Sequence, residues 1–179
     1  MDVRIRSESA EDHDAVRGLL LDAFDGDDVP ARLVELLRDS SVDVPGMAFV
    51  ALVEERLVGY AKLTHLDIHG DRSFVALNLT PVGVATAHQG RGIGRMLVEH
   101  ALRAAEEGSD VPLVILEGDP RHYHRYGFRR ASGAGIERPS SSIPDAAFQF
   151  APLSRYQAEH HRGRAEYPQP FHELQAYGP

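Results

Sequence analysis

The spacing of apolar residues predicts two helices near the start of the chain. A short strand over residues 3–6 comes first. Val16, Leu20 and Phe24 then recur at the spacing of one helix face. A second helix should begin near Pro30, because proline is favoured in the first turn of a helix.

Three longer apolar stretches predict the central strands, at residues 47–53, 57–68 and 74–84. The first is a continuous apolar run, which is typical of a strand buried on both faces. Pro81 lies inside the third stretch and has no backbone N–H. We therefore expect a bulge, or the end of strand pairing, near Pro81.

The second half of the chain predicts two more helices and two more strands. A helix should start at Ile93, with the apolar face Ile93, Met96, Leu97, His100, Ala101 and Ala104. A strand over 111–116 precedes Asp119-Pro120, a pair typical of a capped helix start. That helix should end at Gly127, before a last strand over 146–150. The order β-α-α-β-β-β-α-β-α-β predicts an α/β or α+β domain over residues 1–151. Residues 152–179 form a tail that either packs on the domain or is partly disordered.

Composition and charge exclude several classes of protein. The 179 residues carry a formal net charge of −8, so nucleic acid is not an expected partner. No apolar run approaches the roughly 20 residues that span a bilayer. There is no signal-peptide core either, and we expect a cytoplasmic protein without a membrane partner. Cysteine is absent, which excludes a cysteine acyl-enzyme.

A glycine-rich loop joins the third long strand to the following helix. Gly90, Gly92 and Gly94 stand at a helix start, where backbone N–H groups and the helix dipole favour a phosphate. A tight connection without a ligand is the alternative. The dinucleotide fingerprint fails because its third glycine position is Arg95. The nucleoside-triphosphate loop fails because the only lysine is Lys62, far from the loop.

Two motifs resemble the GCN5-related N-acetyltransferase superfamily. Gln89-x-x-Gly92-x-Gly94 resembles its pyrophosphate loop, and the stretch from His122 to Phe128 resembles its aromatic-Tyr-x-x-x-Gly-Phe signature. The closest likeness is to a bacterial branch with a later motif similar to Gly-Asp-Pro-x-Tyr-Tyr-x-Arg-Phe-Gly-Phe. This chain departs from the pattern at His122, which replaces an aromatic residue, and at Thr86, where many members carry proline.

The resemblance implies a single domain whose mixed, mostly antiparallel sheet is splayed at an acyl-CoA site, with helices on both faces. It also implies acetyl-CoA as co-substrate, an amine acceptor and no metal. The cofactor-binding residues carried over are Val82, Val84, Gln89, Gly90, Arg91, Gly92, Ile93, Gly94 and Arg95. For Arg91 and Arg95, a solvated helix turn is an equal alternative.

The implied mechanism is direct attack of the amine on the thioester in a ternary complex. Tyr123 is the expected general acid, because a tyrosine is protonated at neutral pH; a packing role is the alternative. A backbone N–H near Val84 would stabilise the oxyanion. The general base is either Glu117 or a water chain.

Acceptor specificity should come from the segment after the first helix, with Phe24 and Asp25 as candidate substrate contacts. The acidic cluster of Asp22, Asp25, Asp27 and Asp28 would attract a cationic amine, although helix capping explains it equally well. An acyl-CoA sensor without transferase activity is the alternative function, and a homodimer is left open.

Overall fold

The computed structural model describes residues 2–176. Within them nine strands form one sheet, and there are five α-helices. The strands are β1 (Arg4–Ser7), β2 (Asp43–Val53), β3 (Arg56–His69), β4 (Phe74–Val84), β5 (Leu113–Glu117), β6 (Arg129–Arg130), β7 (Ile136–Glu137), β8 (Phe148–Pro152) and β9 (Gly163–Glu166). The helices are α1 (His13–Ala23), α2 (Val29–Arg38), α3 (Ile93–Gly108), α4 (Pro120–Tyr123) and α5 (Gln169–Leu174).

The sheet is mixed and mostly antiparallel, with the main order β1-β2-β3-β4-β5-β8-β6. Strands β4 and β5 run parallel, as do β7 and β9. The β4–β5 pairing consists of only two residue pairs, Leu77 with Val114 and Asn78 with Ile115. Beyond Asn78 the two strands separate, which confirms the predicted splayed sheet.

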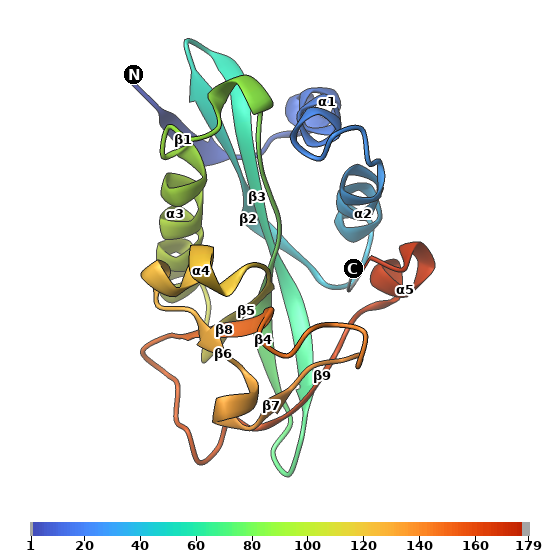
Figure 1. Ribbon diagram of the computed structural model, residues 1–179, viewed down its shortest axis with the longest axis vertical. Helices are drawn as coiled ribbons and strands as arrows, with labels where there is room; N and C mark the ends of the chain where they lie inside the picture. The colour runs from blue at the N-terminus through green and yellow to red at the C-terminus, as the bar shows by residue number, and fades with distance from the viewer. Residues whose placement is uncertain (1, 177–179) are drawn as a thin grey trace.

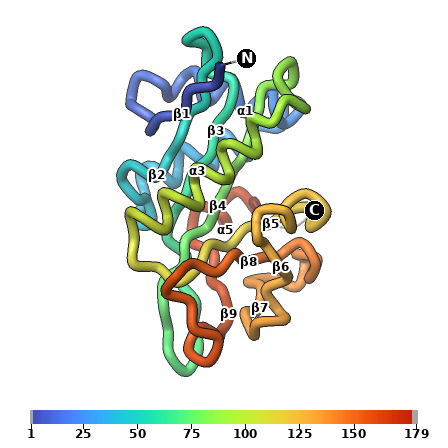
Figure 2. Tube along the Cα trace, turned by 90° about the vertical axis from the view of Figure 1, so that its left-hand side faces the viewer, coloured from blue at the N-terminus to red at the C-terminus, as the bar shows by residue number. Residues whose placement is uncertain are grey.

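Helices cover both faces of the sheet (Figure 1). One face carries α3, which lies in front of the strands in the view of Figure 2, and the other carries α1, α2 and α5. The apolar stripe of α3 packs on one core with residues from β2, β3, β4 and β5. Buried leucines of α1 and α2 pack on the opposite face. This arrangement confirms an α/β domain with helices on both faces.

The interruption predicted at Pro81 is a β-bulge. Ala61 pairs with Val82 and Leu63 with Leu79, so Thr80 and Pro81 together stand opposite Lys62 alone. Pairing with β3 resumes after the bulge and continues to Val84.

Two expectations about the elements need correction. In α3 the buried face includes Val98 and Ala105, whereas Met96 is exposed. The predicted stripe was therefore rotated slightly toward solvent. Strand β2 begins at Asp43 rather than at residue 47, because Asp43 pairs with Thr64 across a register shift.

The segment after β8 contributes a strand and a helix to the described structure. Strand β9 pairs with β3 through Asp67 with Glu166, Ile68 with Ala165 and His69 with Arg164. The rings of Tyr167 and Phe171 stack at 4.4 Å beside the buried Leu33 of α2. A domain boundary after residue 151 stays a prediction. In the described part of the chain, no helix combines the length and apolarity required to cross a bilayer.

Candidate active site

The loop between β4 and α3 is shaped by two glycines in the left-handed region. Gly90 has φ +71° and Gly92 has φ +85°, values that favour glycine strongly. A Cβ built on either residue would meet no heavy atom within 4 Å. The space beside both glycines is therefore open, as a close approach by a ligand requires.

Helix α3 begins with unsatisfied donors at this loop. Gly92 is its N-cap, and its first hydrogen bond runs from the Met96 N–H to the Gly92 carbonyl. The N–H groups of Ile93, Gly94 and Arg95 thus have no carbonyl acceptor within the helix. This geometry suits a phosphate.

Two polar contacts hold the loop in place. The Gln89 amide donates to the Val84 carbonyl at 3.1 Å. The Thr86 N–H donates to the Asp22 carboxylate at 2.7 Å, and its hydroxyl donates to the Asp22 carbonyl at 3.0 Å. Proline at position 86 would lack this N–H, so the departure from the family pattern ties the loop to α1.

Both predicted phosphate-binding arginines are exposed at the start of α3. The Arg95 guanidinium donates to the Glu99 carboxylate at 2.8 Å on the next helical turn. Arg91 lies between the two left-handed glycines. Contacts from either arginine to a cofactor stay predictions.

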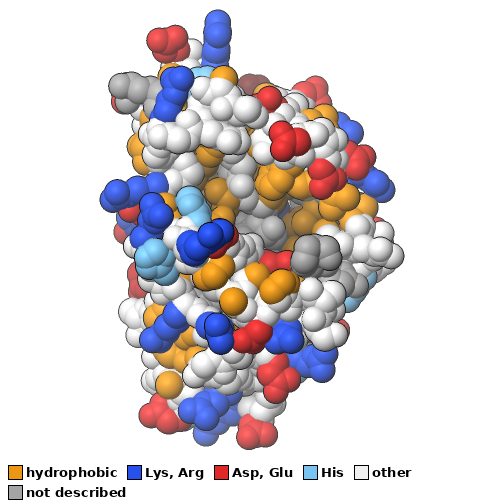
Figure 3. Space-filling model, in the orientation of Figure 1, with side chains coloured by type: hydrophobic (Ala, Val, Ile, Leu, Met, Phe, Trp, Pro, Cys, Tyr) orange, Lys and Arg blue, Asp and Glu red, His pale blue; other side chains and the backbone are white. Residues whose placement is uncertain are grey.

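A cleft of about 440 Å³ opens where β4 and β5 separate. Figure 3 shows this face of the molecule hollowed, with hydrophobic side chains on the walls. The lining comes from the end of α1, from α2, β4, β5, α4 and the C-terminal segment: Phe24, Asp27, Val29, Pro30, Leu33, Asn78, Leu79, Thr80, Pro81, Val82, Glu117, Tyr123, Tyr167, Phe171, Gln175 and Ala176. Past Asn78, the described pairing of β4 is with β3 alone. Its other edge therefore offers backbone groups to a ligand, much as an edge strand does.

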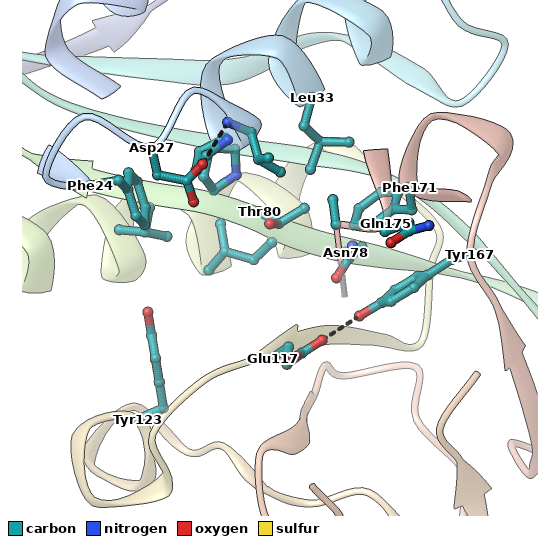
Figure 4. Close-up of a pocket in the computed structure, with 16 residues that line it drawn as sticks. Phe24, Asp27, Leu33, Asn78, Thr80, Glu117, Tyr123, Tyr167, Phe171 and Gln175 are labelled. Carbon is teal, nitrogen blue, oxygen red and sulfur yellow. Dashed lines mark hydrogen bonds between the residues drawn. The ribbon is translucent and has the colours of Figure 1, made fainter. Parts of the chain in front are cut away.

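Tyr123 reaches the cleft from a capped short helix. The Asp119 carboxylate accepts from the Arg121 N–H at 2.9 Å, which confirms Asp119 as the cap. The Tyr123 hydroxyl points into the cleft (Figure 4). Its ring contacts Phe128 and Tyr126 edge-on. Burial, and then the neighbouring Tyr126, raise the pKa of Tyr123 above its ordinary value of 10.0, so the phenol stays protonated.

Most carboxylates of the acidic cluster have partners within the protein. Asp22 accepts from Thr86, and Asp27 accepts from the N–H of Val29, the first residue of α2, at 3.0 Å. Asp28 lies 4.0 Å from the Arg32 guanidinium. Phe24 and Asp27 line the cleft, whereas Asp25 is not among its lining residues. The substrate contacts predicted at Phe24 and Asp25 stay predictions.

The floor of the cleft contains Glu117, the candidate general base, together with the polar residues Tyr167 and Asn78, which the sequence motifs did not indicate. The Tyr167 hydroxyl donates to the Glu117 carboxylate at 3.4 Å (Figure 4). Burial and the nearby Glu117 charge raise the pKa of Tyr167 far above its ordinary value. Asn78 is 2% exposed, and neither polar atom of its amide has a hydrogen-bond partner. Its signal in the sequence was a lone asparagine within an apolar strand, where asparagine is disfavoured.

Comparisons with known proteins identify a family match and solved structures with the same fold. Residues 45–130 match the family described as "Acetyltransferase (GNAT) domain". A GNAT-family N-acetyltransferase from Escherichia coli (YhbS), crystallised with CoA, is 27% identical with a TM-score of 0.86, over 95% of this chain and 92% of that one. A GNAT-family acetyltransferase from Brucella melitensis, crystallised with acetyl-CoA, is 24% identical with a TM-score of 0.76, over 95% of this chain and 98% of that one. No curated protein sequence matches this chain.

A splayed mixed sheet, with a glycine loop at the start of α3, defines the acyltransferase class of fold. The family match over residues 45–130 and the fold of the whole chain are those of the GCN5-related N-acetyltransferase superfamily.

Proposed function

We propose that this protein transfers the acetyl group of acetyl-CoA to a primary amine by direct attack in a ternary complex. One observation carries the proposal. A ligand that lies along the open edge of β4 would reach two places. The start of α3, which suits an anion, lies beyond the end of β4, and the Tyr123 hydroxyl lies across the cleft.

The residues present fit acetyl-CoA. The left-handed Gly90 and Gly92 leave open space beside the N–H groups of Ile93 and Gly94, where a pyrophosphate would be held. The unpaired edge of β4, including Val82, would receive the pantetheine arm. When bound there, acetyl-CoA supplies a thioester as the acyl donor.

The chain's own groups then orient the acceptor and move protons. The amine nitrogen forms a bond to the carbonyl carbon, and the carbon–sulfur bond breaks. Tyr123 holds the proton that the departing thiolate needs, since its raised pKa keeps it protonated. The ammonium proton must leave before attack, and Glu117 on the cleft floor is the candidate acceptor, directly or through water. Backbone N–H groups of β4 near Val84 would stabilise the oxyanion.

The charges of the cleft favour a cationic acceptor. Among its lining residues within the described chain, the charged side chains are Asp27 and Glu117, and both are acidic. An ammonium group is attracted to this lining, whereas an anionic acceptor is repelled.

The test is a panel of primary amines with acetyl-CoA, in which release of the CoA thiol is followed. The chain has no cysteine, so the thiol reagent reports CoA alone. We expect acetylation of cationic amines without added metal. Tight binding of acetyl-CoA without turnover on any amine would instead favour the acyl-CoA sensor. The Tyr123 hydroxyl in the cleft argues against a sensor, which needs no proton donor.

A further inference from the structure

Resting on the proposed function, we infer that Asn78 and Glu117 form the acceptor subsite, and that the acceptor is a compact amine with a neutral amide close to its ammonium group. Asn78 is thus assigned as the residue that recognises the amide. Glu117 is assigned as the residue that receives the ammonium.

The first step is the unsatisfied amide of Asn78. Its side chain is almost fully buried, yet both its NH₂ and its carbonyl oxygen lack partners. Thr64 stands opposite on β3, and its buried hydroxyl also has no partner. A buried amide without hydrogen bonds is costly. Since Asn78 lines the cleft, a ligand offering one acceptor and one donor would satisfy it.

The second step places Glu117 beside it. Asn78 pairs with Ile115, and Glu117 lies two residues further along β5. Side chains two residues apart on a strand share a face. Both side chains therefore point to the α2 and α5 side of the sheet, and Figure 4 shows both entering the cleft. An ammonium at Glu117 and an amide at Asn78 must accordingly belong to one compact molecule.

The third step is the wall around this pair. Leu33 of α2 and Phe171 of α5 are buried apolar residues that line the same cleft. They suit a short apolar side chain on the acceptor. In the described chain no lining residue is basic, which selects a neutral amide over a carboxylate. A longer acyl chain in this space would leave the Asn78 amide unsatisfied.

The experiment compares acceptors that share the 3-methylbutylamine unit. Leucinamide carries the amine, the amide and an apolar branch. Leucine replaces the amide with a carboxylate, and 3-methylbutylamine lacks it. The tripeptide Leu-Ala-Ala carries the same unit at a peptide terminus, so it distinguishes a free amide from a peptide as the source. We expect leucinamide to exceed leucine and 3-methylbutylamine in kcat/KM by about 10-fold or more, the worth of hydrogen bonds to a buried partner.

Variants test whether Asn78 causes the preference. We expect Asn78→Leu to lower the ratio of kcat/KM for leucinamide over 3-methylbutylamine by about 10-fold. Thr64→Val removes the neighbouring unpaired hydroxyl outside the cleft and should keep the ratio. Asn78→Asp removes the NH₂ donors and should also lower this ratio. It replaces Asn78→Leu in the test if that variant does not fold. Calorimetry of leucinamide with the CoA-saturated protein should show the same loss of affinity in the Asn78 variants.

The outcomes separate this inference from the proposed function. If leucinamide binds through Asn78 but is never acetylated, the proposed transferase activity is wrong and the proposed subsite is supported. Acetylation without preference for the amide would overturn the subsite, as would an unchanged ratio in folded Asn78 variants. Absence of leucinamide binding to the CoA-saturated protein would also overturn it.

Discussion

The ring of Tyr123 lies directly against the backbone of Gly118. A Cβ atom at residue 118 would stand 2.9 Å from the Tyr123 Cδ2 and closer still to Cε2. Contacts this short do not occur in folded proteins, so the ring would have to move. Gly118 is therefore required for the position of the proposed general acid.

Gly118→Ala should displace Tyr123 and lower kcat. The backbone of Gly118 is not in the left-handed region, so alanine conflicts only with the ring. A misplacement of about 1 Å can cost up to about 100-fold in rate, and we expect a loss of 10- to 100-fold. Gly133→Ala is the matched control, because its Cβ would meet nothing within 4 Å. Equal turnover in the two variants would contradict this role.

Tyr123→Phe should lower kcat by about 100-fold, within the range for a lost general acid. The phenylalanine ring keeps the contacts with Phe128, so acetyl-CoA affinity should stay near that of the parent. Steady-state kinetics and calorimetry measure the two quantities. Tyr126→Phe is the control, since Tyr126 does not line the described cleft. A matched loss of affinity would show that Tyr123 is a binding residue.

The pH profile should show no loss from Tyr123 up to about pH 10. Burial raises its pKa above 10.0, and the protonated form is the one that donates. Any alkaline decrease in kcat due to this group must therefore lie above that value. A decrease between pH 8 and 9 that disappears in Tyr123→Phe would contradict the assignment.

Gly92→Val should abolish acetyl-CoA binding. Valine would fill the open space at the start of α3, and φ +85° strains any branched side chain. Gly46→Val carries the same backbone strain, at φ +79° and also with open space, but stands in β2 away from the loop. Both variants should lose stability by about 1–2 kcal/mol. Only Gly92→Val should lose binding in calorimetry, and equal binding in both would exclude this loop as the phosphate site.

Asp22→Ala should weaken acetyl-CoA binding by about 3- to 10-fold, because the exposed, charge-assisted hydrogen bond to the Thr86 N–H holds the loop. Asp14→Ala, an exposed acidic residue on the same helix, is the control. Amide hydrogen exchange of residues 85–92 should accelerate in Asp22→Ala alone. If the exchange rates are unchanged, Asp22 does not hold the loop in place.

The sequence predicted the elements that have a strong hydrophobic periodicity or a proline or glycine at a boundary. Strand β4 begins and ends as expected, and the bulge lies at Pro81 because proline lacks a ladder donor. The short strands β6, β7 and β9 were missed. In β9 only Ala165 is buried, so pairing with β3 rather than an apolar pattern defines it.

The candidate site likewise has parts that the sequence predicted and parts that it did not. The glycine loop and Tyr123 were predicted because local motifs resemble a family. Of the cleft floor only Glu117 was named in advance, as a candidate general base. Asn78, Tyr167 and Phe171 were not, because they lie on segments far apart in sequence that meet only through the fold. Asp25 was predicted from its place in the sequence, and its substrate contact stays a prediction. Its φ of +54° belongs to the turn that follows α1, and Asp27 is the acidic residue of this segment that lines the described cleft.

The brief contact between β4 and β5 has a mechanical consequence. The sheet consists of two leaves, joined at the strand level by two residue pairs. Side chains beneath α3, including Leu77 and Val114, belong to one core that spans both leaves. A second core on the opposite face, which includes Ala76 and Ile115, also spans both leaves. The leaves are thus held by packing on both faces more than by hydrogen bonds across the gap. Small changes in the width of the gap beyond these two pairs therefore break no hydrogen bond of the sheet, and the cleft can widen without loss of strand pairing.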